Sequence, residues 1–285
     1  MSAVAQPVAA RPRSRAAGRA LTRARRELLT IYALLGFAYL LLPVAVVVLF
    51  SFNHPKGRFN YTWQGFTWSN WTNWDAVPGL KPALELSLEI AAIASLAATA
   101  LGTLIALALV RYRFRGRAVT NVLIFLPMSS PEIVLGASLL TLFLSFSFFT
   151  LGFWTIVIAH VMFCISYVVV TVKARLIGFD RHLEEAAMDL GANEWVTFAR
   201  VTLPLIAPAI LAALLLCFAL SIDDFVITNF VAGQEVTFPL FVWGAARAAV
   251  PPQINVVGSA IFAVAVGVML ANVLVQMRRA RKGAA

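Results

Sequence analysis

The sequence predicts an all-α membrane protein with six transmembrane helices. Hydrophobic residues make up 61% of the chain and charged residues only 13%, which is about half of what soluble proteins carry. Six apolar runs are each long enough for a helix to cross about 30 Å of hydrocarbon. Backbone polar groups in lipid must pair within their own segment, so each run is expected to be helical. The runs are residues 29–50, 84–110, 119–144, 153–172, 203–222 and 254–275.

The segments between these runs complete the predicted organisation. No internal repeat is visible, so the six spans are expected to form one domain, residues 29–278, between a disordered basic tail (1–28) and a short tail (279–285). The polar segment 51–82 carries four tryptophans, Trp63 among them. These rings suit either the lipid headgroup layer or a lid that meets an external partner. Segment 223–253 is apolar enough to dip into the membrane or to pack under the spans.

The basic residues predict the orientation in the membrane. If the N-terminus is cytoplasmic, 19 of the 23 Lys and Arg residues lie inside and four lie outside. This bias predicts a plasma-membrane protein with both termini in the cytoplasm. The net charge of +10 therefore reflects topology and attraction to anionic lipid, and a nucleic-acid partner is not expected. The outer and intramembrane parts hold seven acidic residues against four basic ones.

The residues for catalysis or cofactor binding are few. The three histidines lie on different sides of the membrane or within it, so a shared metal site is not expected, and the lone His160 is interpreted as a packing residue. No lysine follows a glycine, which excludes a Walker A loop. Both cysteines lie in predicted spans and are interpreted as small apolar residues. Any energy from ATP is therefore expected to come from another subunit.

Acidic residues inside the predicted membrane region indicate a functional path. A carboxylate near the bilayer centre is unfavourable unless it faces a cavity or a partner. Glu132 follows Pro131 near the middle of the third run, and a private partner in the bundle is the alternative to a role in the path. Asp223 and Asp224 end the fifth run, where two adjacent carboxylates favour a nearby cation. An ordinary solvated helix end is the alternative for this pair.

The segment 173–202 is the longest charged interruption between apolar runs, and we interpret it as a soluble helical segment with a glycine inside the helix. Glu185-Ala186-Ala187 is followed by Gly191 and, after nine residues, by Val201-x-Leu203-Pro204. This pattern resembles the EAA signature of permease subunits of ABC importers, with Val in place of Ile at position 201. The resemblance extends over residues 28–278.

The resemblance implies a type I ABC importer permease fold with a cytoplasmic coupling helix in the loop 173–202. In similar permeases this helix lies in a groove of the ATPase subunit, and closure of the ATPase dimer tilts the permease pair. A dimer of ATPase subunits, which bind ATP and Mg, a second permease subunit and an external solute-binding protein are the implied partners. The residues that the resemblance assigns to coupling are Glu184, Glu185, Ala186, Ala187, Asp189, Gly191, Glu194, Leu203 and Pro204.

Three further segments resemble the spermidine/putrescine branch: the outer segment with Ser51-Phe52-Asn53 and Trp63, Ser130-Pro131-Glu132 and Ser221-Ile222-Asp223-Asp224. The branch commonly has Asp where Glu132 stands. The resemblance therefore implies a substrate path for a polyamine-like cation, since carboxylates and aromatic faces bind ammonium groups. The residues of this path are Trp63, Glu132, Ser221, Asp223 and Asp224.

Two other functions remain open from the sequence. The same machine could carry an amino-acid derivative, a phosphonate or a metal chelate. An ion-coupled secondary transporter would act without an ATPase, but its typical inverted repeats and broken helices are not recognised in this sequence. An intramembrane hydrolase would need a nucleophile and a base, and no such pair is found.

Overall fold

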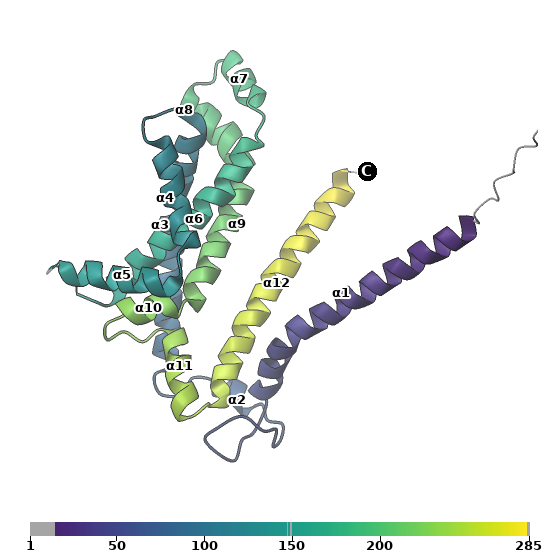
Figure 1. Ribbon diagram of the computed structural model, residues 1–285, viewed down its shortest axis with the longest axis vertical. Helices are drawn as coiled ribbons and strands as arrows, with labels where there is room; N and C mark the ends of the chain where they lie inside the picture. The colour runs from purple at the N-terminus through teal and green to yellow at the C-terminus, as the bar shows by residue number, and fades with distance from the viewer. Residues whose placement is uncertain (1–14, 147, 149, 284–285) are drawn as a thin grey trace, which may run out of the picture. The chain divides into compact units, whose positions relative to one another are not determined.

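The computed structural model describes residues 15–146, 148 and 150–283, and the chain divides into two compact units. One unit combines Met1–Trp74 with Pro251–Ala285, and the other comprises Asp75–Val250. Each unit is built almost entirely of helices in its described part (Figure 1). The second unit contains every predicted site residue except Trp63.

Three long helices form the core of the unit Asp75–Val250. They are α3 (Leu80–Arg111), α6 (Phe153–Ile177) and α9 (Leu203–Asp223), which pack against one another along their lengths (Figure 1). Small side chains on α3 allow this close packing, as is usual for helices that meet inside lipid. At Gly102 an added Cβ atom would lie 2.6 Å from the Cβ of Val168, so only glycine lets α3 and α6 approach this closely.

The third predicted span is broken, which corrects the expectation of one straight helix over 119–144. It consists of α4 (Arg117–Ser129) and α5 (Glu132–Ser145), which meet at an angle of 110°. Pro131 causes the break, because it lacks a backbone N–H and disfavours a helical conformation at the preceding residue. Ser130 accordingly has extended backbone angles, φ −82° and ψ 141°. A broken helix is therefore present, contrary to the expectation from the sequence.

Shorter elements lie at the two ends of this core. At one end, α7 (His182–Asp189) and α8 (Glu194–Thr197) connect α6 to a π-helical turn, η1 (Phe198–Thr202), and then to α9 (Figure 1). At the other end, α10 (Val226–Val231) packs against α5 and α6, and α11 (Phe238–Ala248) packs against α3 and α9. The segment 223–253 thus packs against the spans, which was one of the two expected arrangements.

The other unit contains α1 (Arg15–Ser51), α2 (Ser69–Thr72) and α12 (Pro252–Gly283), with α12 packed against α1 and α2. Helix α1 begins within the tail expected to be disordered over 1–28, and residues 1–14 lie outside the described residues. The Ala- and Arg-rich composition of this tail favours a helix. Between α1 and α2, the side-chain amide of Asn53 donates to Asn60 Oδ1 at 2.6 Å and thereby ties the polar outer segment together.

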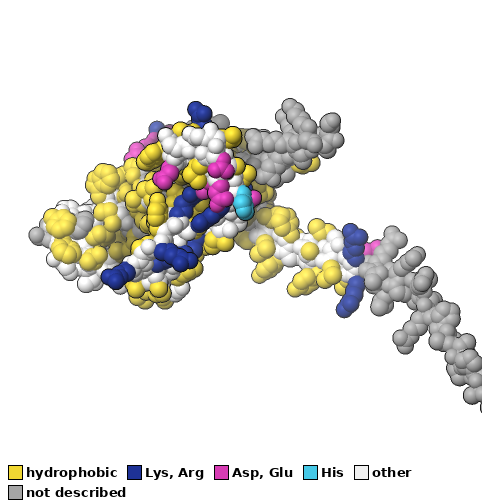
Figure 2. Space-filling view, turned by 90° about the horizontal axis from the view of Figure 1, so that it is seen from above, with side chains coloured by type: hydrophobic (Ala, Val, Ile, Leu, Met, Phe, Trp, Pro, Cys, Tyr) yellow, Lys and Arg dark blue, Asp and Glu magenta, His cyan; other side chains and the backbone are white. Residues whose placement is uncertain are grey.

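The membrane class predicted from the sequence is confirmed. Within the described residues, five helices are long and apolar enough to cross a membrane, and the bent pair α4 and α5 makes a sixth span if it counts as one. The spans expose many large apolar side chains, because their solvent is lipid. Figure 2, seen from the end that bears α7 and α8, shows charged side chains of both signs gathered there and hydrophobic side chains on the flanks.

Candidate functional site

The EAA segment folds as the short helix α7, and Gly191 ends this helix rather than lying inside it. The N–H of Gly191 donates to the carbonyl of Met188 at 2.9 Å, and the N–H of Ala192 donates to the carbonyl of Ala187 at 3.1 Å. These two bonds form a Schellman motif, whose C′ residue adopts a left-handed conformation. Gly191 has φ +89°, which is favourable for glycine and strained for other residues. The expected mid-helix glycine is therefore corrected to a helix-ending glycine.

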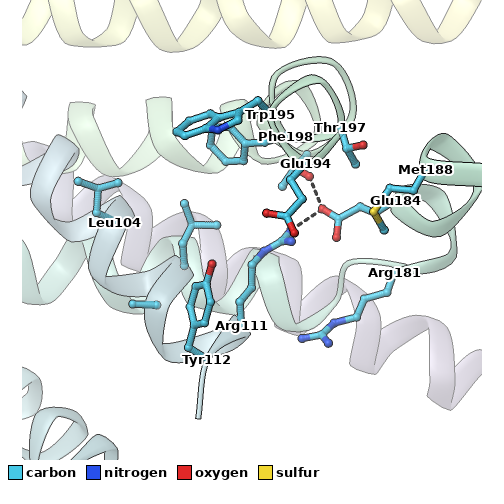
Figure 3. Close-up of a pocket in the computed structure, with 13 residues that line it drawn as sticks. Leu104, Arg111, Tyr112, Arg181, Glu184, Met188, Glu194, Trp195, Thr197 and Phe198 are labelled. Atoms are coloured by element: carbon cyan, nitrogen blue, oxygen red, sulfur yellow. Dashed lines mark hydrogen bonds and ion pairs between the residues drawn. The ribbon is translucent and has the colours of Figure 1, made fainter. Parts of the chain in front are cut away.

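Glu184 anchors α7 to the core. Its side chain is only 10% exposed and forms an ion pair with the guanidinium of Arg111 at the end of α3. The hydroxyl of Thr202, in η1, donates a hydrogen bond to the same carboxylate oxygen. Figure 3 shows the Glu184 carboxylate directed toward the guanidinium of Arg111, and the two partners come from different helices. One side chain thus joins α7 to the elements that lead into two of the three core helices.

The electrostatics of this anchor favour the ionised carboxylate. Burial by itself raises the pKa of Glu184, but the hydrogen bonds from Arg111 and Thr202, together with the charge of Arg181, outweigh burial and hold the pKa below its ordinary value. The predicted coupling residue Glu184 therefore faces inward and positions α7. It leaves the outer face of the helix to other side chains.

The outer face of α7 is formed by the remaining residues of the EAA segment. Glu185, Ala186 and Asp189 are exposed, Ala187 is half-buried, and Leu190 is 90% exposed. Small and acidic side chains on one exposed helix face permit close approach of another protein surface. Leu190 adds an exposed apolar side chain beside them.

Beyond Gly191 the chain turns into α8 and then into the fifth span. The side chain of Asn193 accepts a hydrogen bond from the N–H of Val196 at 2.8 Å and so caps α8. Glu194 is exposed at the first turn of α8, and Trp195 beside it is 81% exposed. Leu203 and Pro204 begin α9 directly after the π-helical turn, where a proline at the second helical position is tolerated.

A cavity of about 560 Å³ opens between α3, α7, α8 and η1. Arg111, Arg181 and Glu184 give it a charged wall, and Trp195 and Tyr112 face it from opposite sides (Figure 3). Trp195 and Tyr112 were not predicted as site residues. The signal in the sequence was a tryptophan next to Glu194, in a segment that is polar and lies outside the apolar runs.

The predicted cation path is partly assembled at the opposite end of the core. Asp223 is exposed at the last position of α9, and Glu132 and Asp224 lie close enough to it for their charges to interact. Glu132 is exposed at the first position of α5, directly after the break at Pro131. The break therefore brings an acidic residue of the third span to the end of the fifth.

Asp224 points the other way, into the protein. Its side chain is only 7% exposed, and Oδ2 accepts hydrogen bonds from the N–H and the hydroxyl of Thr228 at 2.8 and 2.7 Å. His160 Nε2 lies 3.4 Å from the same oxygen. Ser221 is also buried, with its Oγ 2.6 Å from His160 Nδ1. Asp223 is therefore exposed and the side chain of Asp224 is buried, although from the sequence we expect the two to act as a pair.

Trp63 belongs to the other unit, where its ring is 44% exposed and lies edge-on against Phe50 at 6.4 Å between centroids.

His160 has hydrogen-bond partners at both ring nitrogens, as expected of a packing histidine, but its partners include two predicted path residues. Among the described residues no group of three His, Cys, Asp or Glu side chains is arranged to hold a metal ion.

Comparison with known proteins gives consistent matches. Residues 98–281 match the family described as "Binding-protein-dependent transport system inner membrane component". The spermidine/putrescine transport system permease protein PotC of Escherichia coli (strain K12) is 38% identical over 244 residues, or 84% of this chain and 90% of the relative. The putrescine transport system permease protein PotI of the same strain is 41% identical over 263 residues, or 88% and 91%.

Solved structures share the fold at low sequence identity. A bacterial ABC transporter involved in the import of the acidic polysaccharide alginate has a chain that is 20% identical, with a TM-score of 0.60 over 95% of this chain and 99% of that chain. The bacterial alginate ABC transporter in complex with an alginate pentasaccharide-bound periplasmic protein gives a TM-score of 0.61 at 16% identity, over 87% of this chain and 93% of that chain.

The apolar helices, the broken span and the exposed anchored helix define a class, that of multi-pass permease subunits of the inner membrane. Within this class, the chain belongs to the family of binding-protein-dependent transport system inner membrane components, the permeases of ABC importers. The predicted resemblance to the spermidine/putrescine branch of this family is confirmed.

Proposed function

We propose that this chain is the permease subunit of an ATP-driven importer for a polyamine-like cation, such as putrescine or spermidine, which an external binding protein delivers. The observation that carries the proposal is helix α7, which presents an exposed face and is tied to the core by Glu184. A helix that is free on one face and fixed on the other is suited to pass a neighbour's motion into the membrane bundle.

The neighbour that moves α7 is an ATPase dimer in the cytoplasm, which binds ATP and Mg. Glu185, Asp189 and Glu194 supply polar contacts to it, and the small side chains of Ala186 and Ala187 allow close approach. Leu203 and Pro204 begin the span that receives the motion. Closure of the ATPase dimer draws two such helices together, and the permease pair changes between inward-facing and outward-facing states. This chain itself catalyses no reaction.

A second, similar permease subunit completes the path, most simply as a heterodimer. We propose that both termini and α7 lie in the cytoplasm, because this orientation puts most of the basic residues on the inner side of the membrane. The end that bears α10 then faces outward, toward the binding protein. The solved complex with a periplasmic protein, whose chain has the same fold, supports such a partner.

The cargo is proposed from the acidic residues at the α10 end. Glu132 and Asp223 are exposed carboxylates from two different spans whose charges interact. Two nearby carboxylates repel each other, and a ligand with two ammonium groups relieves this repulsion. The names of the sequence relatives, which are spermidine/putrescine and putrescine permeases, support the same cargo. Trp63 is proposed to contact the cation through its ring.

Reconstitution tests the proposal. The chain is placed in vesicles with its ATPase, its sister permease and the external binding protein, and uptake of labelled putrescine is measured with and without internal ATP. We expect uptake that requires ATP and is reduced by unlabelled spermidine. Uptake driven by an ion gradient without the ATPase would instead favour a secondary transporter, whose broken helices this chain shares. A binding protein that binds neither polyamine would contradict the cargo.

A further inference from the structure

A buried polar cluster lies behind the proposed cation path. His160, in α6, is only 1% exposed. Its Nδ1 is 2.6 Å from Ser221 Oγ in α9, and its Nε2 is 3.0 Å from Thr228 Oγ1 in α10. The imidazole thus joins three helices at the end of the core where the acidic residues gather.

The hydrogen bonds of the cluster assign the tautomer of the imidazole. The hydroxyl of Thr228 donates its one proton to Asp224, so toward His160 it accepts, and Nε2 carries the proton. In the neutral ring Nδ1 then accepts a hydrogen bond from the hydroxyl of Ser221. With these directions every side chain of the cluster is satisfied, which makes the arrangement specific.

The cluster acts on the two exposed acids, Asp223 and Glu132, through different contacts. It holds Asp224 inward, and because the chain leaves the helix at this residue, with φ −64° and ψ 119°, the preceding Asp223 stays exposed, within range of the charge of Glu132. It also holds α10 through Thr228. Phe230 of α10 packs against Gly136 of α5, where an added Cβ atom would lie 2.5 Å from the ring. Glu132 is the first residue of α5.

We propose that His160 is a positioning residue for the cation path, which holds Asp223 and Glu132 in place without touching the cargo. This inference rests on the proposed function. Removing the imidazole leaves the polar groups of the cluster without one of their hydrogen-bond partners and allows the turn between α9 and α10 to move. The carboxylates of Asp223 and Glu132 are then no longer held at fixed positions relative to each other.

The test compares His160→Leu, His160→Gln and the control Cys164→Ala in the reconstituted importer. Glutamine keeps a donor near the position of Nε2, whereas leucine removes both polar atoms. Cys164 is equally buried one turn further along α6 and contacts α9, but it hydrogen-bonds to none of the acids. Three quantities are measured: the amount of assembled complex, ATP hydrolysis, and putrescine uptake per ATP hydrolysed.

We expect His160→Leu to assemble and hydrolyse ATP but to lose roughly tenfold in uptake per ATP. The Gln variant should lie between Leu and wild type, and the Cys164 control should match wild type. If putrescine uptake per ATP hydrolysed is unchanged in the Leu variant, whether or not less complex assembles, the inference is overturned. If the Leu variant does not assemble, the Gln variant decides by the same ratio. Absence of putrescine uptake by the wild type would instead contradict the proposed function.

Discussion

The ion pair between Arg111 and Glu184 should decide how well α7 transmits motion. In Arg111→Met, the Glu184 carboxylate, only 10% exposed, loses its ion-pair partner but keeps the bond from Thr202 and the nearby charge of Arg181. Removing one partner of a buried charge pair costs about 3–5 kcal/mol. Arg111 is 32% exposed, so water screens part of this loss and about 1–3 kcal/mol remains. This free energy corresponds to roughly a 5- to 150-fold change in an equilibrium.

The assay is a double-mutant cycle on uptake per ATP hydrolysed, with Arg111→Met, Glu184→Gln and the double variant. We expect each single variant to hydrolyse ATP while its uptake falls, because α7 is no longer fixed to α3. In the double variant, the fold reduction in uptake per ATP hydrolysed should be smaller than the product of the fold reductions in the two single variants. The difference should correspond to a coupling free energy of about 1–2 kcal/mol. Arg115→Met, an exposed arginine of the loop after α3, serves as the control and should behave as wild type. Fully multiplicative losses would refute the anchor.

Other residues give further predictions. Gly191→Val should disturb the end of α7 and uncouple uptake from ATP hydrolysis, since φ +89° strains a non-glycine residue by about 1–2 kcal/mol; normal coupling would count against the docking role. Asp223→Asn should lower putrescine uptake in a fully assembled complex, whereas Asp224→Ala should reduce assembly, and equal effects on both measurements would contradict their opposite orientations. The lowered pKa of Glu184 means that its contribution to stability is fully present above the ordinary pKa and is lost as the pH falls through the lower pKa of the folded state. Hydrogen exchange in α7 should therefore rise only below the ordinary titration range of a glutamate, and a rise near neutral pH would be inconsistent with the anchor.

The membrane architecture could be predicted because it depends on local features. Each apolar run is long enough to span the bilayer, and most Lys and Arg residues lie in alternate connecting segments and the two tails, which predicts that these share one side of the membrane. The break in the third span also had a local signal in Pro131, but proline inside a membrane helix often causes only a kink. Its angle of 110° depends on the packing of α5 against α10, which no local pattern contains.

The inward orientation of Glu184 and the role of His160 could not be predicted in the same way. Glu184 pairs with a residue 73 positions earlier, and His160 meets partners 61 and 68 positions later. In an eight-residue helix with acidic residues at two adjacent positions, the sequence alone does not tell which of Glu184 and Glu185 faces the core. A lone histidine in a span indicates a polar contact but does not identify the partner.

The most direct test of the proposed coupling is a cross-link between α7 and the ATPase in the assembled importer. Ala186→Cys places a thiol on the exposed face of α7, and a short bifunctional reagent is applied to inside-out and right-side-out vesicles. We predict a cross-linked product with the ATPase, formed from the cytoplasmic side and changed in yield by ATP. A product with the external binding protein, or none with the ATPase from either side, would contradict the role of α7 as the coupling helix.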